Sequence, residues 1–271
     1  MMKVGVIVDC FQKGLYEGIK LAAQCGAEAV QFTSRTPEIH PDNITPAVIK
    51  EIKDMVSSLG MEISSYCSSL RFGFSEEGIA NGNIELTKKM MDISQEFGVN
   101  VMNAHAGQLK TPSVRRAVTE IGKYCESVGG YFALETGPET PEFLKEFIET
   151  IDTNAIRVNF DPANLVMIQG VDAAEAATTV GKYIMHTHAK DGILVSKPEG
   201  RTWYDLEAEE RGPVTDYFLE VPLGEGHVNF PKYIGALKEI GYDGFLTIER
   251  EAGDNRYEDI KNGIAFLKSL R

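Results

Sequence analysis

The chain has 271 residues, of which 43% are hydrophobic and 25% charged, an ordinary composition for a globular protein with a sizeable core. Its 40 acidic residues outnumber its 27 lysines and arginines, and the net charge of −13 makes nucleic acid a poor partner. No apolar stretch is long enough to cross a membrane, and Asp9 interrupts the apolar start too early for a signal peptide. The four cysteines lack metal-type spacing and indicate reduced thiols. We therefore expect a cytoplasmic protein.

Short apolar runs rich in β-branched residues alternate with helical patterns along the whole chain. Thr45, Pro46 and Gly60 mark one helix clearly, as cap, first residue and stop. The predicted strands cover residues 3–9, 27–34, 61–68, 99–107, 131–137, 155–162, 182–191 and 244–251. The predicted helices cover residues 16–25, 44–60, 83–98, 113–130, 140–151, 172–181, 230–241 and 257–270.

Complete alternation of strands and helices is typical of parallel strands joined by crossover helices. Eight such units predict an α/β fold, a single (β/α)8 TIM barrel that forms one domain over residues 1–271. The alternative is an open doubly wound sheet, but the first turn lacks its glycine-rich motif.

One connection, residues 191–230 after the seventh strand, is far longer than the others and carries the only tryptophan. We expect it to be an extended active-site loop, with a solvated excursion or an oligomer contact as equal alternatives. The oligomeric state is open, a homo-oligomer included.

Ionisable residues recur where the predicted strands end. In a TIM barrel these ends converge on the face that carries the active site, so such residues are expected to line a shared cavity. They are Asp9, His105, Glu135, Asp161, His188 and Glu249.

Four of these residues, Glu135, Asp161, His188 and Glu249, come from four consecutive strands. Three carboxylates so close would repel one another, and a divalent cation removes that penalty. One imidazole with three carboxylates suits Mn²⁺, Zn²⁺, Mg²⁺ or Co²⁺, so we predict one divalent metal ion held by these four side chains. Taken singly, each residue could instead cap a helix or pair with an arginine.

Several segments of the second half resemble the sugar phosphate isomerase/epimerase family, whose xylose isomerase-like barrel is shared with ketose 3-epimerases and endonuclease IV. The resemblance runs through the whole chain and is most specific from Glu135 onward. The segments are "ALETG", "VNFDPANL", "HTHAKD", "VPLGEGHVNF" and "YDGFLTIERE".

The resemblance implies a metal-dependent isomerase or epimerase acting on a sugar, sugar phosphate or keto-sugar. In members of that family that epimerise free ketoses, two metal-bound glutamates act as bases on opposite faces of the substrate, and the corresponding residues here would be Glu135 and Glu249. They would abstract a proton next to a carbonyl through a metal-stabilised enediolate. The alternative on the same scaffold is an inosose dehydratase-like lyase. An endonuclease IV-like nuclease is less favoured, because a trinuclear zinc site needs more histidines.

Two departures from the family pattern concern the substrate more than the metal. Asn164 stands where many epimerases carry a histidine, and "GILVS" stands where ketose epimerases carry an arginine, for which Arg201 is a candidate substitute. We expect a small sugar or polyol to contact His105, Asn164, Lys190 and Arg201. The aromatic residues Phe11, Phe72, Trp203 and Tyr204 are candidates to cover a sugar face or to belong to the core.

Overall fold

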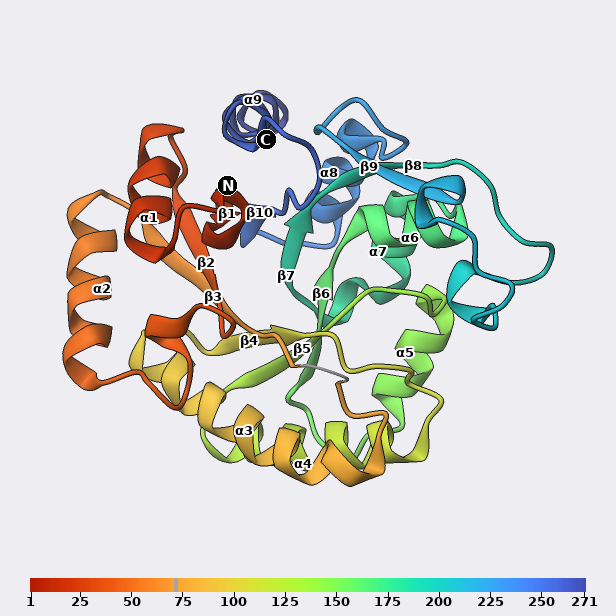
Figure 1. Ribbon diagram of the computed structural model, residues 1–271, viewed down its shortest axis with the longest axis horizontal. Helices are drawn as coiled ribbons and strands as arrows, with labels where there is room; N and C mark the ends of the chain where they lie inside the picture. Colours follow the sequence, from red (N-terminus) through yellow and green to blue (C-terminus); the bar gives the residue numbers. More distant parts are fainter. Residues whose placement is uncertain (71–72) are drawn as a thin grey trace.

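A computed structural model describes residues 1–70 and 73–271, so Phe72 lies outside the described residues. Eight parallel strands close into a barrel in the order β1-β10-β7-β6-β5-β4-β3-β2 (Figure 1). Pairing of β1 with both β2 and β10 completes the closure. The barrel strands are β1 (Lys3–Ile7), β2 (Ala29–Thr33), β3 (Glu62–Ser68), β4 (Val101–Ala104), β5 (Tyr131–Glu135), β6 (Ile156–Phe160), β7 (Ile184–Ala189) and β10 (Phe245–Ile248). The predicted TIM barrel is therefore confirmed.

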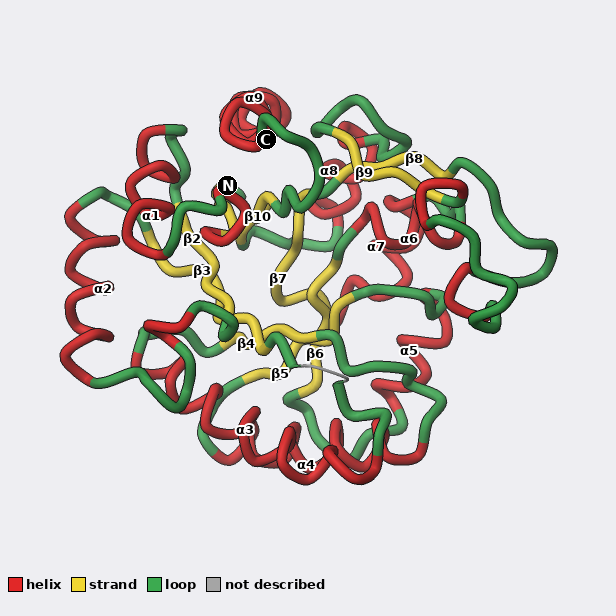
Figure 2. The backbone as a smooth tube through the Cα atoms, in the orientation of Figure 1, coloured by secondary structure: helices red, strands yellow, loops and turns green. Residues whose placement is uncertain are grey.

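Helices surround the barrel on its outside, as the tube in Figure 2 shows. Thr45 caps α2 by accepting a hydrogen bond from the backbone N–H of Val48, and Pro46 is the first helical residue, as predicted. The helices are α1 (Leu15–Gln24), α2 (Pro46–Ser58), α3 (Glu77–Glu96), α4 (Pro112–Ser127), α5 (Pro141–Glu149), α6 (Pro162–Gln169), α7 (Ala173–Val180), α8 (Phe230–Glu239) and α9 (Arg256–Leu270).

Helix α6 was not predicted, because the sequence analysis joined the sixth strand directly to residues 172–181. The signals for a separate helix are Asp161 as its cap, Pro162 as its first residue and Gly170 at its left-handed end. Nearly every side chain of α6 is buried, so the helix lacks the amphipathic period by which helices are recognised. It begins directly at the C-terminal end of β6.

Several predicted ends are shifted, two of them notably. Strand β1 ends at Ile7, and Asp9 lies in the 3₁₀ turn Val8–Phe11 that follows it. There the Asp9 carboxylate accepts hydrogen bonds from the hydroxyls of Thr33 and Thr36. Helix α3 begins at Glu77, six residues before its predicted start.

The long connection after β7 contains a two-stranded antiparallel sheet outside the barrel. Its strands are β8 (Asp191–Leu194) and β9 (Phe218–Val221), and the chain then returns to α8. The hairpin and the segment between its strands lie over one side of the barrel, next to α6 (Figure 1).

Polar side chains fill much of the barrel interior below the C-terminal ends of the strands. Gln31, Ser65, Asn103, Asn159 and Thr247 are all fully buried there. TIM barrel interiors are usually packed with branched apolar residues, so a polar layer needs hydrogen-bond partners from neighbouring strands. It forms the base of the site described below.

The four cysteines are free and buried, in agreement with the predicted reduced thiols. Within the described part of the chain, no helix is both long and apolar enough to span a bilayer.

Candidate metal site and cavity

Four side chains converge at the C-terminal end of the barrel strands, which we call the barrel mouth. Glu135 ends β5, Asp161 and Glu249 directly follow β6 and β10, and His188 lies within β7. Each offers one ligand atom, and these atoms all lie within 4.8 Å of one another. Ligands about 2.0–2.2 Å from a metal ion stand at most about 4.4 Å apart, so small side-chain movements would suffice. The cluster is consistent with a divalent metal site.

The two carboxylate oxygens of Asp161 have different surroundings: one caps helix α6 and the other faces the cluster. Oδ1 caps α6 by accepting from the backbone N–H groups of Ala163 at 2.8 Å and Asn164 at 3.1 Å. Oδ2 is buried and has no hydrogen-bond partner within the described residues. An unsatisfied buried carboxylate oxygen is costly, and a cation would supply the missing partner. Helix capping and metal binding are therefore compatible roles for this residue.

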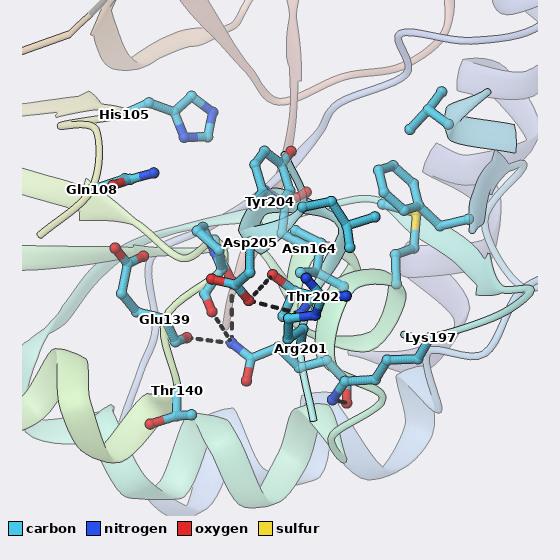
Figure 3. Close-up of a pocket in the computed structure, with 18 of the residues that line it drawn as sticks. His105, Gln108, Glu139, Thr140, Asn164, Lys197, Arg201, Thr202, Tyr204 and Asp205 are labelled. Atoms are coloured by element: carbon cyan, nitrogen blue, oxygen red, sulfur yellow. Dashed lines mark hydrogen bonds between the residues drawn. The ribbon is translucent and has the colours of Figure 1, made fainter. Parts of the chain in front are cut away.

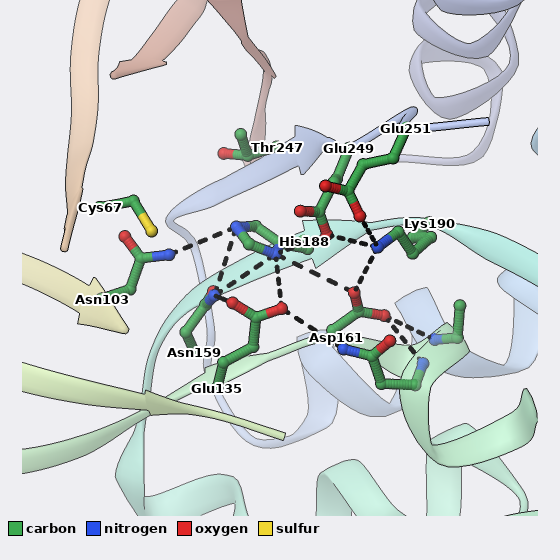
Figure 4. A network of polar contacts seen from close by, with 12 residues as sticks. Cys67, Asn103, Glu135, Asn159, Asp161, His188, Lys190, Thr247, Glu249 and Glu251 are labelled. Atoms are coloured by element: carbon green, nitrogen blue, oxygen red, sulfur yellow. Dashed lines mark hydrogen bonds and ion pairs between the residues drawn. The ribbon is translucent and has the colours of Figure 1, made fainter. Parts of the chain in front are cut away.

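His188 presents one ring nitrogen to the carboxylates and the other to the barrel interior (Figure 4). Its Nδ1 lies 3.2 Å from Glu249 Oε2, 3.5 Å from Glu135 Oε1 and 4.0 Å from Asp161 Oδ2. Its Nε2 lies 3.2 Å from the side-chain oxygen of Gln31. If Nδ1 binds a cation, Nε2 must carry the proton, and Gln31 Oε1 is then its acceptor.

The polar layer beneath the cluster holds His188 and Glu135 from below. The Asn159 amide nitrogen donates to Glu135 Oε2 at 3.3 Å, while Gln31 of the same layer lies beneath His188. Asn159 Oδ1 in turn contacts His186 Nδ1 at 2.8 Å, and His186 Nε2 contacts the Thr247 hydroxyl at 3.0 Å. Burial, with the charge of His188, keeps the pKa of His186 well below its usual value, so His186 is neutral. It lies below the cluster and supports it.

Lys190 is a buried ammonium group at the edge of the cluster. Its Nζ lies 2.9 Å from Glu249 Oε2, 3.1 Å from Glu251 Oε2 and 4.0 Å from Asp161 Oδ2. The side chain is only 7% exposed. These carboxylates compensate the charge that burial would otherwise penalise.

His105 and Asn164 lie on either side of Glu135. The Nε2 atom of His105 and the amide nitrogen of Asn164 are each 3.3 Å from Glu135 Oε1. Asn164 also donates to the backbone oxygen of Thr136 at 3.1 Å. The His105 side chain is 67% exposed, toward the cavity above the cluster.

Burial and neighbouring charges shift the pKa values of several side chains in and around the cluster. Burial and the neighbouring carboxylates of Glu249 and Glu135 raise the pKa of Asp161 to about 7, against the opposing charge of Lys190. Although burial acts in the other direction, Lys190 and His188 lower the pKa of Glu249 to about 2. Glu135 raises the pKa of His105 to about 9. Without a cation, the carboxylates thus depend on protons and on Lys190 for charge balance.

A cavity of about 1620 Å³ opens above the cluster. Glu135, Asn164 and Lys190 belong to its lining next to the cluster, and the long connection after β7 supplies many of the other lining residues, among them Arg201 and Tyr204 (Figure 3). Arg201 lines this cavity, but its guanidinium pairs with both oxygens of Glu210 at 3.0 and 3.1 Å. Of the four predicted substrate contacts, three lie next to the cluster and Arg201 lies on the outer loop.

Asp191 holds both ends of the long connection together, a role that the sequence analysis missed. Its buried carboxylate accepts hydrogen bonds from the backbone N–H groups of Gly192, Gly224, Gly226 and Val228, at 2.8–3.1 Å. A Cβ atom on Gly226 would meet Asp191 Oδ1 at 2.2 Å, so this close approach requires glycine. The sequence signal was the "GEG" turn, but its partner lies more than thirty residues earlier.

Residues 19–270 match the model of a protein family described as the xylose isomerase-like TIM barrel. The chain belongs to this family. Two curated relatives match about half of the chain or less. One is an uncharacterized protein of Methanocaldococcus jannaschii, 29% identical over 142 residues, which are 49% of this chain and 41% of that protein. The other is an inosose dehydratase of Clostridium botulinum, 30% identical over 118 residues, which are 43% of this chain and 37% of that enzyme.

Solved structures of the same fold cover almost the entire chain. A xylose isomerase domain protein from Planctomyces limnophilus matches with a TM-score of 0.80 at 22% identity, over 100% of this chain and 96% of that one. A D-psicose 3-epimerase from Clostridium cellulolyticum matches with a TM-score of 0.74 at 15% identity, over 99% of both chains. A Mycobacterium smegmatis protein in complex with magnesium matches with a TM-score of 0.75 at 18% identity, over 100% and 96%. These likenesses establish the shared fold.

Proposed function

We propose that the protein is a divalent-metal-dependent isomerase or epimerase of a sugar, keto-sugar or related polyol. The observation that carries the proposal is the convergence of one imidazole and three carboxylates, with Asp161 Oδ2 buried and unpartnered within the described residues. The magnesium bound to the Mycobacterium smegmatis relative supports a divalent ion, as Mg²⁺, Mn²⁺, Zn²⁺ or Co²⁺.

Glu135 and Glu249 are the proposed acid–base pair. They stand at β5 and β10, with β6 and β7 between them, so they approach the cluster from its two sides. A carboxylate on each side can remove a proton from one face of a carbon and return one to the other face. A divalent ion in the cluster would polarise the substrate carbonyl and stabilise negative charge on its oxygen.

Neighbouring side chains support this division of labour. Asn164 and His105 hold Glu135 through Oε1, and Lys190 holds Glu249 through Oε2. All three also line the cavity, where they can donate hydrogen bonds to substrate hydroxyl or carbonyl oxygens. Arg201 is proposed as a more distant contact that would first have to leave Glu210.

The direct test is proton exchange in D₂O. The metal-loaded protein is incubated with ketoses, keto-inositols and 3-keto-glycosides, and deuterium is sought beside the carbonyl by NMR. Loss of a positioned base costs about 10²–10⁴-fold in rate, so Glu135→Gln and Glu249→Gln should each slow exchange by that factor. Absence of exchange across the panel would refute the proposal.

A second candidate is a lyase that begins with the same proton abstraction and then loses hydroxide. The inosose dehydratase relative favours it. Here Lys190, which contacts Glu249, would be near enough to the cluster to assist the departing oxygen. Mass spectrometry separates the two candidates, because a dehydratase product is lighter by one water and an epimerised product keeps its mass.

A further inference from the structure

The cavity is larger than a single sugar ring requires. Its volume is about 1620 Å³, whereas small-molecule pockets usually measure about 300–1,000 Å³. Its lining includes Glu135 and Lys190 of the cluster region together with Tyr204 and Leu219 of the long connection. Figure 3 shows Tyr204 and Asn164 within it. A monosaccharide at the cluster would leave its outer part unfilled.

The long connection contributes three exposed apolar side chains to the cavity lining, those of Tyr204, Val214 and Leu219, which we call the apolar wall. Their exposed fractions are 40%, 40% and 38%, and all three line the cavity. Exposed apolar groups of this size are informative when they gather, because scattered ones are normal. Besides these, the large hydrophobic residues exposed in the described part of the chain are Met1, Leu59 and Val195. Of those, only Val195 belongs to the same connection, and it does not line the cavity.

Ring packing connects Tyr204 to the hairpin formed by β8 and β9. The Trp203 ring packs edge-on against Tyr204 at 5.2 Å and against Phe218 at 6.3 Å between centroids. Phe218 belongs to β9 and also lines the cavity, so the Trp203 ring connects Tyr204 to the hairpin. Phe143 lines the cavity as well.

The charges of the cavity lining disfavour an anionic group in the outer part. Seven carboxylate residues line the cavity against five lysines and arginines. Two of the five, Lys190 and Arg201, are in ion pairs. Lys110 lies over the Phe143 ring and Arg211 over the Trp203 ring, while Lys197 donates to the backbone oxygen of Gln169. Three of the carboxylates and Lys190 lie at the cluster, so the rest of the lining holds four carboxylates and four cations, and each of these cations already has a partner. A phosphate in the outer part would therefore meet no net positive charge.

We infer that the substrate has two parts, a polyol or sugar head at the carboxylate cluster and a neutral, ring-sized apolar group against Tyr204, Val214 and Leu219. An aryl glycoside is the simplest molecule of this kind. That the polyol or sugar head binds at the cluster rests on the proposed function. That an apolar group binds at the wall rests on the volume, exposed side chains and charges of the cavity. The wall faces a cavity that continues to the cluster, so a substrate group fits it better than a second protein chain does.

Equilibrium binding without turnover tests the inference. Methyl and phenyl β-D-glucopyranoside are compared on the metal-loaded full chain by ligand-observed NMR, with benzyl alcohol as a probe of the ring alone. Burying a phenyl ring should make the phenyl glycoside bind at least about 10-fold more tightly than the methyl glycoside. Benzyl alcohol should bind saturably in the millimolar range.

Substitutions locate the binding. Leu219→Ser and Tyr204→Ser should each weaken the binding of phenyl glycoside and benzyl alcohol several-fold, while the methyl glycoside is unaffected. Val195→Ser is the matched control, since Val195 is 50% exposed on the same connection but outside the cavity. It should change neither affinity.

Each result has a defined consequence. The inference would be overturned if the two glycosides bind with equal affinity, or if neither phenyl glycoside nor benzyl alcohol binds saturably. It would also be overturned if Val195→Ser and Leu219→Ser have equal effects. A dimer that Leu219→Ser converts to a monomer would also overturn it, since a second copy would then cover the wall. Binding of benzyl alcohol alone, lost in Leu219→Ser, supports the apolar subsite with a head other than glucose. Absence of proton exchange refutes the proposed function but leaves these measurements valid.

Discussion

The two ends of the barrel differ in how the oxygens of their carboxylate side chains are hydrogen-bonded. At the N-terminal end, Glu28 accepts hydrogen bonds from the backbone N–H of Val4 and from both terminal nitrogens of Arg271. At the mouth, Asp161 is buried, and its Oδ2 has no hydrogen-bond partner within the described residues. The first arrangement gives both oxygens of Glu28 a hydrogen bond, whereas the second leaves one buried oxygen of Asp161 without one. Such a cost is typical of a site that is completed by a ligand.

The largest effect is expected at Asp161, where one residue caps a helix and faces the cluster. Asp161→Asn keeps a capping oxygen but removes the negative charge. Loss of a residue that only orients a metal ligand lowers metal affinity by about 10–100-fold, so loss of a charged ligand should lower it by more than about 100-fold. The apoprotein should keep its stability, because Asn is as good a cap as Asp. Calorimetric metal titration and denaturant unfolding measure the two quantities.

Asp161→Ala serves as the companion to this variant. It should lose metal affinity as well, and it should also destabilise the apoprotein by about 1 kcal/mol through loss of the cap. If Asp161→Asn binds metal as tightly as the unchanged protein does, the unpartnered oxygen of Asp161 is not a metal ligand.

The next largest expected effect is a gain in the stability of the folded protein when a metal ion binds. A divalent ion that binds only the folded state at 100 times its dissociation constant should stabilise the protein by about 2.7 kcal/mol. Thermal unfolding with Mn²⁺, Zn²⁺, Mg²⁺ or Co²⁺ measures the shift, and addition of a chelator should reverse it. An unchanged melting temperature with all four ions would count against a metal site at the mouth.

A smaller effect is expected at Gln31, the acceptor for His188 Nε2. Gln31→Met removes the acceptor while keeping the side-chain length, and should weaken metal binding about 10-fold. Gln31→Glu restores an acceptor and should bind metal at least as tightly as Gln31→Met. If Gln31→Met binds metal as well as the unchanged protein does, Gln31 does not orient the histidine.

The smallest effect is expected at the opposite end of the barrel. Against its partial burial, the Arg271 guanidinium and the Val4 N–H lower the pKa of Glu28. A carboxylate with a lowered pKa stabilises the folded state above its unfolded pKa of about 4.3, and this contribution is lost as pH falls through the folded pKa. Glu28→Gln should therefore cost about 0.5–1 kcal/mol at pH 7 and less as the pH falls below 4.

Metal affinity should be unchanged in Glu28→Gln, which makes this variant the control for those at the mouth. A loss of metal binding in it would show that the two ends are coupled.

Much of the fold could be predicted because the signals are local. Strand–helix alternation, Thr45 with Pro46, and ionisable residues at strand ends all lie within short segments. The convergence of Glu135, Asp161, His188 and Glu249 then followed from barrel geometry, since parallel strands end at one face. The roles of these residues in catalysis and metal binding stay predictions.

Other features depend on contacts that no local pattern reveals. Gln31 and His188 meet although 157 residues separate them, and Asp191 binds backbone groups from Gly224 onward. Helix α6 is buried nearly all round, so it lacks the periodicity that marks a surface helix. Each of these was missed for a physical reason: the partner was distant in sequence or the pattern was absent.

The Asp191 carboxylate gives the long connection a common point of departure and return. Four backbone N–H groups from the two ends of the connection bind it, so the chain between them begins and finishes at nearly the same place. Because the two ends are fixed at one place, we expect the part of the connection between β8 and β9 to tolerate changes in length better than its ends do. The residues that this part brings to the cavity, among them Arg201 and Tyr204, can then differ without a change in the barrel itself.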